Sequence, residues 1–268
     1  MSLTGKTKGE TYKDLIHVDN SNNGIDGTLR SLRSDAAETP LKLSTSKVLI
    51  QSDTDSGSLL QIKDSSGNIF FSIDSTNKNI FVGHNLNYVN TQFSHFGINS
   101  TDSANIDAGY HTPIPFIMGG NQSLTGDDNN WHNLFGGGTE PATSATIDTE
   151  ADDLVTSIMY VPANIYIDSV KIMVAGDTAT GDTIRFHFMS FDMVTTDGST
   201  AGNLSNGLVI GDHSDVTHDG YEQIDFINLT LDANNRIVSP GKVLMLLFRC
   251  DTANCDYSVN CTVQYHTT

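Results

Sequence analysis

The densest group of side chains that could bind a metal lies between residues 212 and 219. It consists of two histidines and three aspartates: His213, His218, Asp212, Asp215 and Asp219. Imidazole and carboxylate groups are common zinc ligands, but four residues separate the two histidines, a spacing that matches no helix face. We therefore expect a solvated loop between two strands and no metal site.

Other reactive side chains lack the arrangement that catalysis requires. Asp53 and Asp55 resemble part of a calcium loop without its closing glutamate, so a weak calcium site there, or on an oligomer axis, is only an alternative. Adjacent carboxylates such as Asp127 and Asp128 are uninformative in a chain with 32 acidic residues. The sequence has no phosphate-binding glycine loop and no G-x-S-x-G or H-E-x-x-H motif. We expect no catalytic residue, no cofactor and no enzymatic activity.

The three cysteines, Cys250, Cys255 and Cys261, lie close together near the C-terminus. An odd number argues against a complete disulfide framework, and no C-x-x-C pair indicates zinc. Cys261 falls on the apolar side of an alternating run from Tyr257 to Tyr265, so we predict that it packs as a small core residue.

An eleven-residue repeat spans Ile62 to Gly83, and each copy contains one short strand and one tight turn. Such small units bury too little surface to be stable alone, and only two copies are legible, fewer than a solenoid requires. We therefore predict that other copies of the chain cover the strands in a homotrimeric stalk. The predicted trimer interface is apolar and consists of Ile62, Ile69, Phe70, Ile73, Ile80 and Phe81.

The composition favours an all-β protein. The chain has 23 glycines and only 17% charged residues, and almost no stretch has a sustained helical apolar period. After residue 142 the strands become longer and alternate, as in Ile184, Phe186 and Phe188. Their number and turn signals predict a jelly-roll-like β-sandwich. The buried positions change parity between Ile167 and Val170 and between Phe226 and Ile227, which predicts bulges or turned corners of the sandwich at these two points.

The net charge of −18 is unevenly distributed. Residues 1–100 carry 9 basic and 10 acidic side chains, whereas residues 101–268 carry 5 and 22. The second part therefore repels phosphates, so we expect no nucleic-acid partner, although acidity that merely keeps the protein soluble is an equal alternative. The sequence has no long apolar run and no N-terminal apolar segment, so we expect neither membrane insertion nor export by a signal peptide.

Four segments of the N-terminal part, up to about position 85, resemble the opening of phage virion fibre and fibre-like structural proteins, especially those of short-tailed marine phages. These segments are Thr11 to Leu15, Val18 to Asn22, Gly24 to Leu29 and Leu41 to Ser44. The resemblance implies an N-terminal part that attaches to capsid or tail proteins, a trimeric stalk and an outward C-terminal head. The predicted virion-attachment residues are Tyr12, Leu15, Ile16, Val18 and Leu29.

We therefore predict four parts: an attachment arm (1–45), an oligomeric stalk (46–83), an Asn/Gly-rich linker (84–141) and a sandwich head (142–268). The expected localisation is the virion, assembled in the host cytoplasm. The head would serve in capsid decoration or in adhesion to a host-surface glycan or protein. The alternative is a secreted adhesin or carbohydrate-binding module. The expected absence of a signal peptide and of a disulfide framework favours the virion protein.

Overall fold

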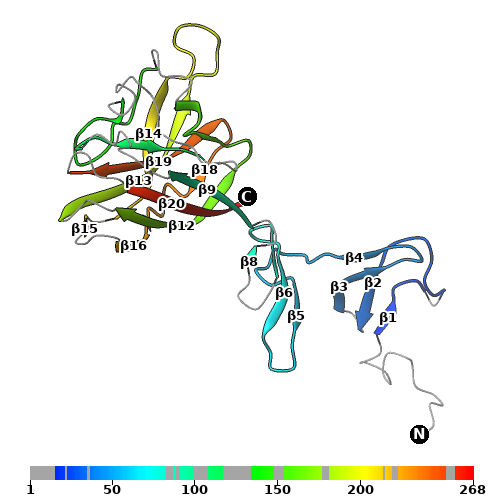
Figure 1. The fold of residues 1–268 in the computed structure, drawn as a ribbon. Helices are drawn as coiled ribbons and strands as arrows, with labels where there is room; N and C mark the ends of the chain where they lie inside the picture. Colours follow the sequence, from blue (N-terminus) through cyan, green and yellow to red (C-terminus); the bar gives the residue numbers. More distant parts are fainter. Residues whose placement is uncertain are drawn as a thin grey trace, which may run out of the picture. The chain divides into compact units, whose positions relative to one another are not determined.

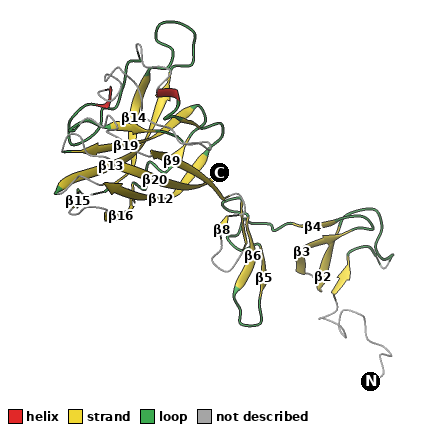
Figure 2. Ribbon diagram, in the orientation of Figure 1, coloured by secondary structure: helices red, strands yellow, loops and turns green. Residues whose placement is uncertain are grey.

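The computed structural model describes most of the chain (Figure 1). The described residues are 16–21, 23–34, 37–82, 87–88, 91–98, 108–116, 134–147, 154–176, 181–213, 215–218, 223–251 and 257–268. Every named element is a strand, so the protein is all-β, as predicted (Figure 2). The chain divides into two compact units, Met1–Val89 and Asn90–Thr268.

The first unit begins with an antiparallel sheet of four strands in chain order. The strands are β1 (Ile16–Val18), β2 (Arg30–Ser34), β3 (Ala37–Leu43) and β4 (Val48–Ile50). Asp26 organises the loop between β1 and β2, because its carboxylate accepts hydrogen bonds from the Arg30 guanidinium and from Thr28 N. The Arg30 hydrogen bond, with that from Thr28, lowers the pKa of Asp26 to about 2.

The eleven-residue repeat forms most of a second antiparallel sheet in this unit. Its strands are β5 (Leu60–Lys63), β6 (Ile69–Asp74), β7 (Asn79–Val82) and β8 (Asn87–Tyr88). Gly67 and Lys78 occupy the same position of the two repeat copies, and both have positive φ, 86° and 59°. Both copies of the repeat therefore place a left-handed backbone conformation at the same position of the turn.

The second unit is a sandwich of two antiparallel sheets. Its strands are β9 (Thr91–Ile98), β10 (Thr112–Ile114), β11 (Met159–Tyr160), β12 (Ile165–Gly176), β13 (Asp182–Met193), β14 (Leu204–Asp212), β15 (Val216–His218), β16 (Gln223–Asn228), β17 (Thr230–Leu231), β18 (Ile237–Val238), β19 (Lys242–Cys250) and β20 (Tyr257–Thr267). One sheet has the order β9-β20-β12-β16, and the other has β10-β19-β13-β14-β17. Without the short strands β11, β15, β17 and β18, these orders are first-eighth-third-sixth and second-seventh-fourth-fifth, the jelly-roll arrangement.

Residues 186–191 of β13 and residues 243–248 of β19 are buried on both faces of their sheet. Phe186, Phe188 and Leu246 belong to the core between the sheets, whereas Met189 and Met245 belong to a second core on the other face. Residues 134–147 and 154–158, which contribute Phe135, Ile147 and Leu154 to that second core, cover this face. Burial on both faces explains why β19 is an almost continuous apolar run instead of an alternating one.

The sandwich begins near residue 90 instead of residue 142. Residues 84–141, predicted as a linker, contain β9 and β10, which pair with β20 and β19. The linker prediction was wrong here, because the Asn- and Gly-rich sequence around β9 and β10 is typical of loops. Of the two predicted irregularities, the bulge between Ile167 and Ser169 is confirmed. No bulge is present at Phe226 and Ile227, because β16 pairs with β12 in continuous register through these residues.

Candidate functional site

The predicted attachment residues that the structure describes belong to the first sheet or its loops. Ile16 and Val18 lie on β1, with Ile16 largely exposed, and Leu29 precedes β2. Tyr12 and Leu15 lie outside the described residues. Ile16 and Val18 face Ser34 and Leu32 of β2 across the ladder, so this edge presents a small, mainly apolar surface.

The second sheet has a continuous apolar face. Cross-strand pairing places Leu60 opposite Ile73 and Ile73 opposite Ile80, while Ile62 faces Phe71 and Phe71 faces Val82. Directly paired residues share a face of the sheet, so these six side chains form two parallel rows. We call this set the stalk face; its members are Leu60, Ile62, Phe71, Ile73, Ile80 and Val82. Ile62, Ile80 and Val82 remain 45%, 44% and 40% exposed in the single chain.

Three of the six predicted trimer-interface residues, Ile62, Ile73 and Ile80, belong to the stalk face. Phe81 does not, because it pairs with Ser72 on the opposite face. Phe70 is the extra residue of a bulge between Ile62 and Lys63 of β5, and it is half exposed. Ile69 lies opposite Lys63, beyond this bulge.

The sequence prediction therefore missed Leu60, Phe71 and Val82. The repeat suggests residues equivalent by translation along the chain, but the strands are antiparallel. Equivalent positions thus do not align across the ladder. Alternation along the strand was the signal that could have identified Phe71, because it lies two residues from Ile73 and therefore on the same face.

The first unit has no buried apolar side chain among its described residues. Between residues 16 and 82, the buried side chains are Ser72 and Asp74, both polar. Asp74 accepts hydrogen bonds from Asn77 N and Nδ2 at 3.0 and 2.8 Å, which is the chemistry of a turn. The described part of this unit thus contains two ordered sheets without an intrachain core.

The second unit also exposes apolar side chains, on the outer side of β16 and β12. Ile224 and Phe226 are 70% and 61% exposed, and Met173 pairs directly with Phe226. β16 is an edge strand of its sheet, so this patch adjoins unpaired backbone groups.

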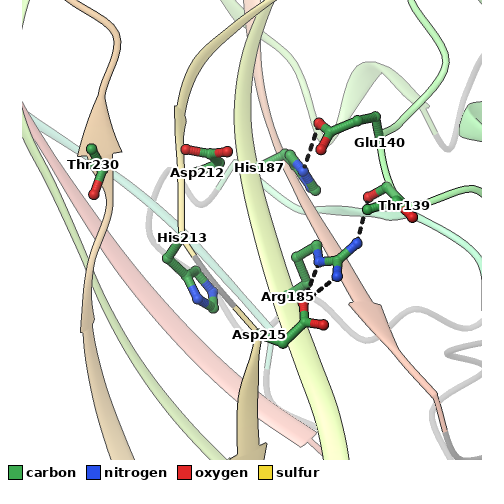
Figure 3. A pocket seen from close by; sticks show the side chains of 8 residues that line it. All are labelled: Thr139, Glu140, Arg185, His187, Asp212, His213, Asp215 and Thr230. Carbon is green, nitrogen blue, oxygen red and sulfur yellow. Dashed lines mark hydrogen bonds and ion pairs between the residues drawn. The ribbon is translucent and has the colours of Figure 1, made fainter.

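The histidine and aspartate cluster is divided by the fold. His218 is fully buried, with Nδ1 2.8 Å from Asp225 Oδ2 and Nε2 3.1 Å from Gly176 O. Asp212, His213 and Asp215 instead line an open polar cleft on the outer face of β13 (Figure 3). Asp219 lies outside the described residues, among which no group of three or more His, Cys, Asp or Glu side chains could hold a metal ion.

The cleft also contains Arg185 and His187, which sequence reasoning treated only as polar positions of an alternating strand. The sequence signal that could have found them is a change of character along one face of β13. Arg185 and His187 are polar, whereas the next residues on that face, Met189 and Phe191, are apolar and covered. A change from apolar to charged side chains along one face marks where the covering segment stops.

Cys250 and Cys261 are both fully buried in the core between the sheets. The prediction that Cys261 packs as a core residue is confirmed. Burial raises the pKa of the Cys261 thiol, which keeps it protonated. Cys255 lies outside the described residues.

In the part of the chain that the structure describes, no helix is long and apolar enough to cross a membrane. No protein-family model and no curated protein sequence matches the chain.

Proposed function

We propose that the chain is a phage virion structural protein that assembles as a fibre-like homotrimer. Its N-terminal part attaches to capsid or tail proteins, and its jelly-roll head projects outward for capsid decoration and stabilisation or for host-surface adhesion. The resemblance of the N-terminal part to virion fibre proteins supports this function.

The observation that carries the proposal is the contrast between the two units. The jelly roll has two cores of its own, whereas the described part of the first unit has ordered sheets without one buried apolar residue. Small sheets of this kind need a packed face for stability. Burying the exposed fractions of Ile62, Ile80 and Val82 would contribute about 1 kcal/mol for each side chain. Neighbouring copies of the chain supply that cover in a trimer.

The charge distribution fits the same orientation. The acidic residues are concentrated after residue 100, and like-charged heads repel one another less when they project into salt solution. The nearly neutral N-terminal part is better suited to docking on another protein.

Replacing Phe71 and Ile73 by aspartate tests the trimer. The double substitution places two charges in the stalk face, so it should convert the trimer into monomers whose jelly roll remains folded. Light scattering should give three times the mass of one chain for the wild type and the mass of one chain for the variant. Gln61→Asp, on the other face of β5, is the matched control and should stay trimeric. A wild-type mass of one chain would refute the trimer.

Deleting residues 1–45 tests attachment. The truncated protein should remain folded and trimeric but should no longer bind virions that lack the protein. Binding that survives the deletion would place the docking surface elsewhere in the chain.

Competition for host cells separates the two roles of the head. If adhesion is the role, an excess of folded protein should reduce adsorption of intact particles. Unchanged adsorption, together with lower heat or osmotic resistance of particles that lack the protein, would favour decoration. Copy number per particle would then distinguish a sparse fibre from an abundant decoration protein.

The second candidate is a secreted adhesin or carbohydrate-binding module. The jelly-roll topology with a polar cleft on one sheet favours it, since lectin domains and viral capsid proteins share this architecture. Detection of the chain in purified particles rather than free in the culture medium would decide against this candidate.

A further inference from the structure

The polar cleft on the jelly roll has a volume of about 610 Å³ and opens to solvent. Five parts of the chain supply its lining: strands β13, β14 and β17, the residues between β14 and β15, and the segment that covers the second core. The lining residues are Thr139, Glu140, Arg185, His187, Asp212, His213, Asp215 and Thr230 (Figure 3). All eight carry hydroxyl, carboxylate, guanidinium or imidazole groups.

Three of these side chains form a row across the sheet. His187 of β13 pairs with Asp212 of β14, and Asp212 pairs with Thr230 of β17. Adjacent strands lie about 4.8 Å apart, so the row extends over about 10 Å. Three polar groups at this spacing can contact successive hydroxyls of one small ligand.

His187 contributes a buried hydrogen-bonding group to this row. Its side chain is 1% exposed, and Nε2 lies 3.2 Å from Glu140 Oε2. Burial lowers the pKa of His187 to about 4, so the ring is neutral at pH 7 and Nε2–H donates to Glu140. Nδ1 is then an acceptor, and it has no hydrogen-bond partner within the described residues. A buried polar atom without a partner needs an explanation, and an ordered water or a ligand hydroxyl would supply the missing hydrogen bond.

Arg185, two residues before His187 on β13, provides further donors. Its NH1 donates to Thr139 O at 2.7 Å, and the guanidinium also pairs with Asp215. These contacts hold the guanidinium plane in place before a ligand arrives. Asp212 and Glu140 add carboxylate acceptors, so the cleft offers fixed donors and acceptors together.

We propose that this cleft binds a neutral saccharide. Sugar hydroxyls both donate and accept hydrogen bonds, which matches a lining of carboxylates, hydroxyls and a guanidinium. The three carboxylates repel an anionic ligand, and the single Arg185 does not offset them. The same excess of carboxylates would attract a cation, so a cationic ligand is the alternative that the experiment has to separate. The lining has no apolar side chain that would favour an apolar ligand.

This inference rests on the proposed function for its biological role, because it places host-surface recognition on the head. Saccharide binding is nevertheless a property of the purified chain and is measured without particles or cells. A chain that binds a saccharide but no virion would contradict only the proposed function, whereas a virion-attached trimer without saccharide affinity would contradict only this inference.

The test uses the purified full-length protein on a printed glycan array, followed by saturation-transfer NMR with the best neutral glycan. Asp212→Asn should weaken binding about ten-fold, because it removes a charged acceptor, and Thr230→Ala should weaken it about three-fold. Asp197→Asn is the matched control, since Asp197 is exposed and lies outside the cleft lining.

Binding of a neutral glycan that Asp212→Asn weakens and Asp197→Asn does not would support the site. No glycan bound, or equal binding by the Asp212→Asn variant, would overturn it. Spermidine is tested in the same way, and binding of spermidine without any glycan would also overturn the proposal, because it would identify a cation site.

Discussion

Acid should destabilise the jelly roll through two buried histidines, His111 and His187. Both rings are at most 1% exposed, and their centroids lie 5.1 Å apart in an edge-to-face arrangement. Burial lowers the pKa of each from 6.5 to about 4, and it outweighs the hydrogen bond from His111 to Gly136 O and the attraction of His187 to Asp212, both of which raise the pKa. Both rings are therefore neutral in the folded protein at pH 5, where unfolded histidines are charged.

The size of the effect follows from proton linkage. Between pH 6.5 and pH 4 the unfolded state binds more protons than the folded state, so the free energy of unfolding falls as the pH decreases. Each histidine should remove about 2 kcal/mol between pH 8 and pH 5, and the pair about 4 kcal/mol. This is a large part of the total stability of a typical domain, which is on the order of 10 kcal/mol.

Urea unfolding followed by circular dichroism at a fixed protein concentration measures this loss at pH 8 and pH 5. The single variants His111→Gln and His187→Gln should each reduce the loss by about 2 kcal/mol, and the double variant should nearly abolish the contribution of the pair. Because each variant is compared with itself at two pH values, its overall stability cancels.

His95→Gln is the control, because His95 is exposed on β9. It should leave the pH dependence unchanged. If the double variant loses as much stability between pH 8 and pH 5 as the wild type, the two buried rings do not cause the acid sensitivity and the reasoning is wrong.

One substitution and one labelling reaction test the core. Tyr257→Phe should lower the free energy of unfolding by about 2 kcal/mol in urea denaturation, because Tyr257 Oη donates to the buried Asp182 carboxylate at 2.6 Å; a change below about 0.5 kcal/mol would contradict this. Cys261 should resist alkylation in the native protein and react after unfolding, because it is buried and its thiol stays protonated. Peptide mass spectrometry measures this, and rapid native labelling of Cys261 would contradict its burial.

The fold class was predictable because alternating apolar and polar residues along a strand indicate which of its faces is buried. In β13, Ile184, Phe186 and Phe188 alternate with polar residues, and the structure buries these three in the core. The first two jelly-roll strands were not predicted. Strand β9 lies in a segment whose Asn- and Gly-rich composition indicated a linker, and β10 is three residues long, which leaves too little pattern to recognise. Its assignment depends on its pairing with β19, which is a contact between residues far apart in the sequence.

The polar cleft was harder still to predict, because residues far apart in the sequence form it. Asp212, His213 and Asp215 are close in sequence and were noticed together, but Arg185 and Glu140 come from other parts of the chain. Their proximity depends on the register of β13 with β14 and on the path of the covering segment. No local sequence pattern indicates this register or this path, so the sequence predicts only a solvated loop at residues 212–219.

The two units also differ in the source of their stability, and this difference connects the fold to the proposed assembly. The jelly roll buries Phe186, Phe188 and Leu246 within one chain, so its stability does not require a second copy. The stalk face, by contrast, leaves Ile62 and Ile80 almost half exposed. Selection against aggregation normally removes exposed apolar faces of this kind from monomers. The stalk face is such an exposed apolar face. A partner surface of the same composition is therefore the best explanation for its presence.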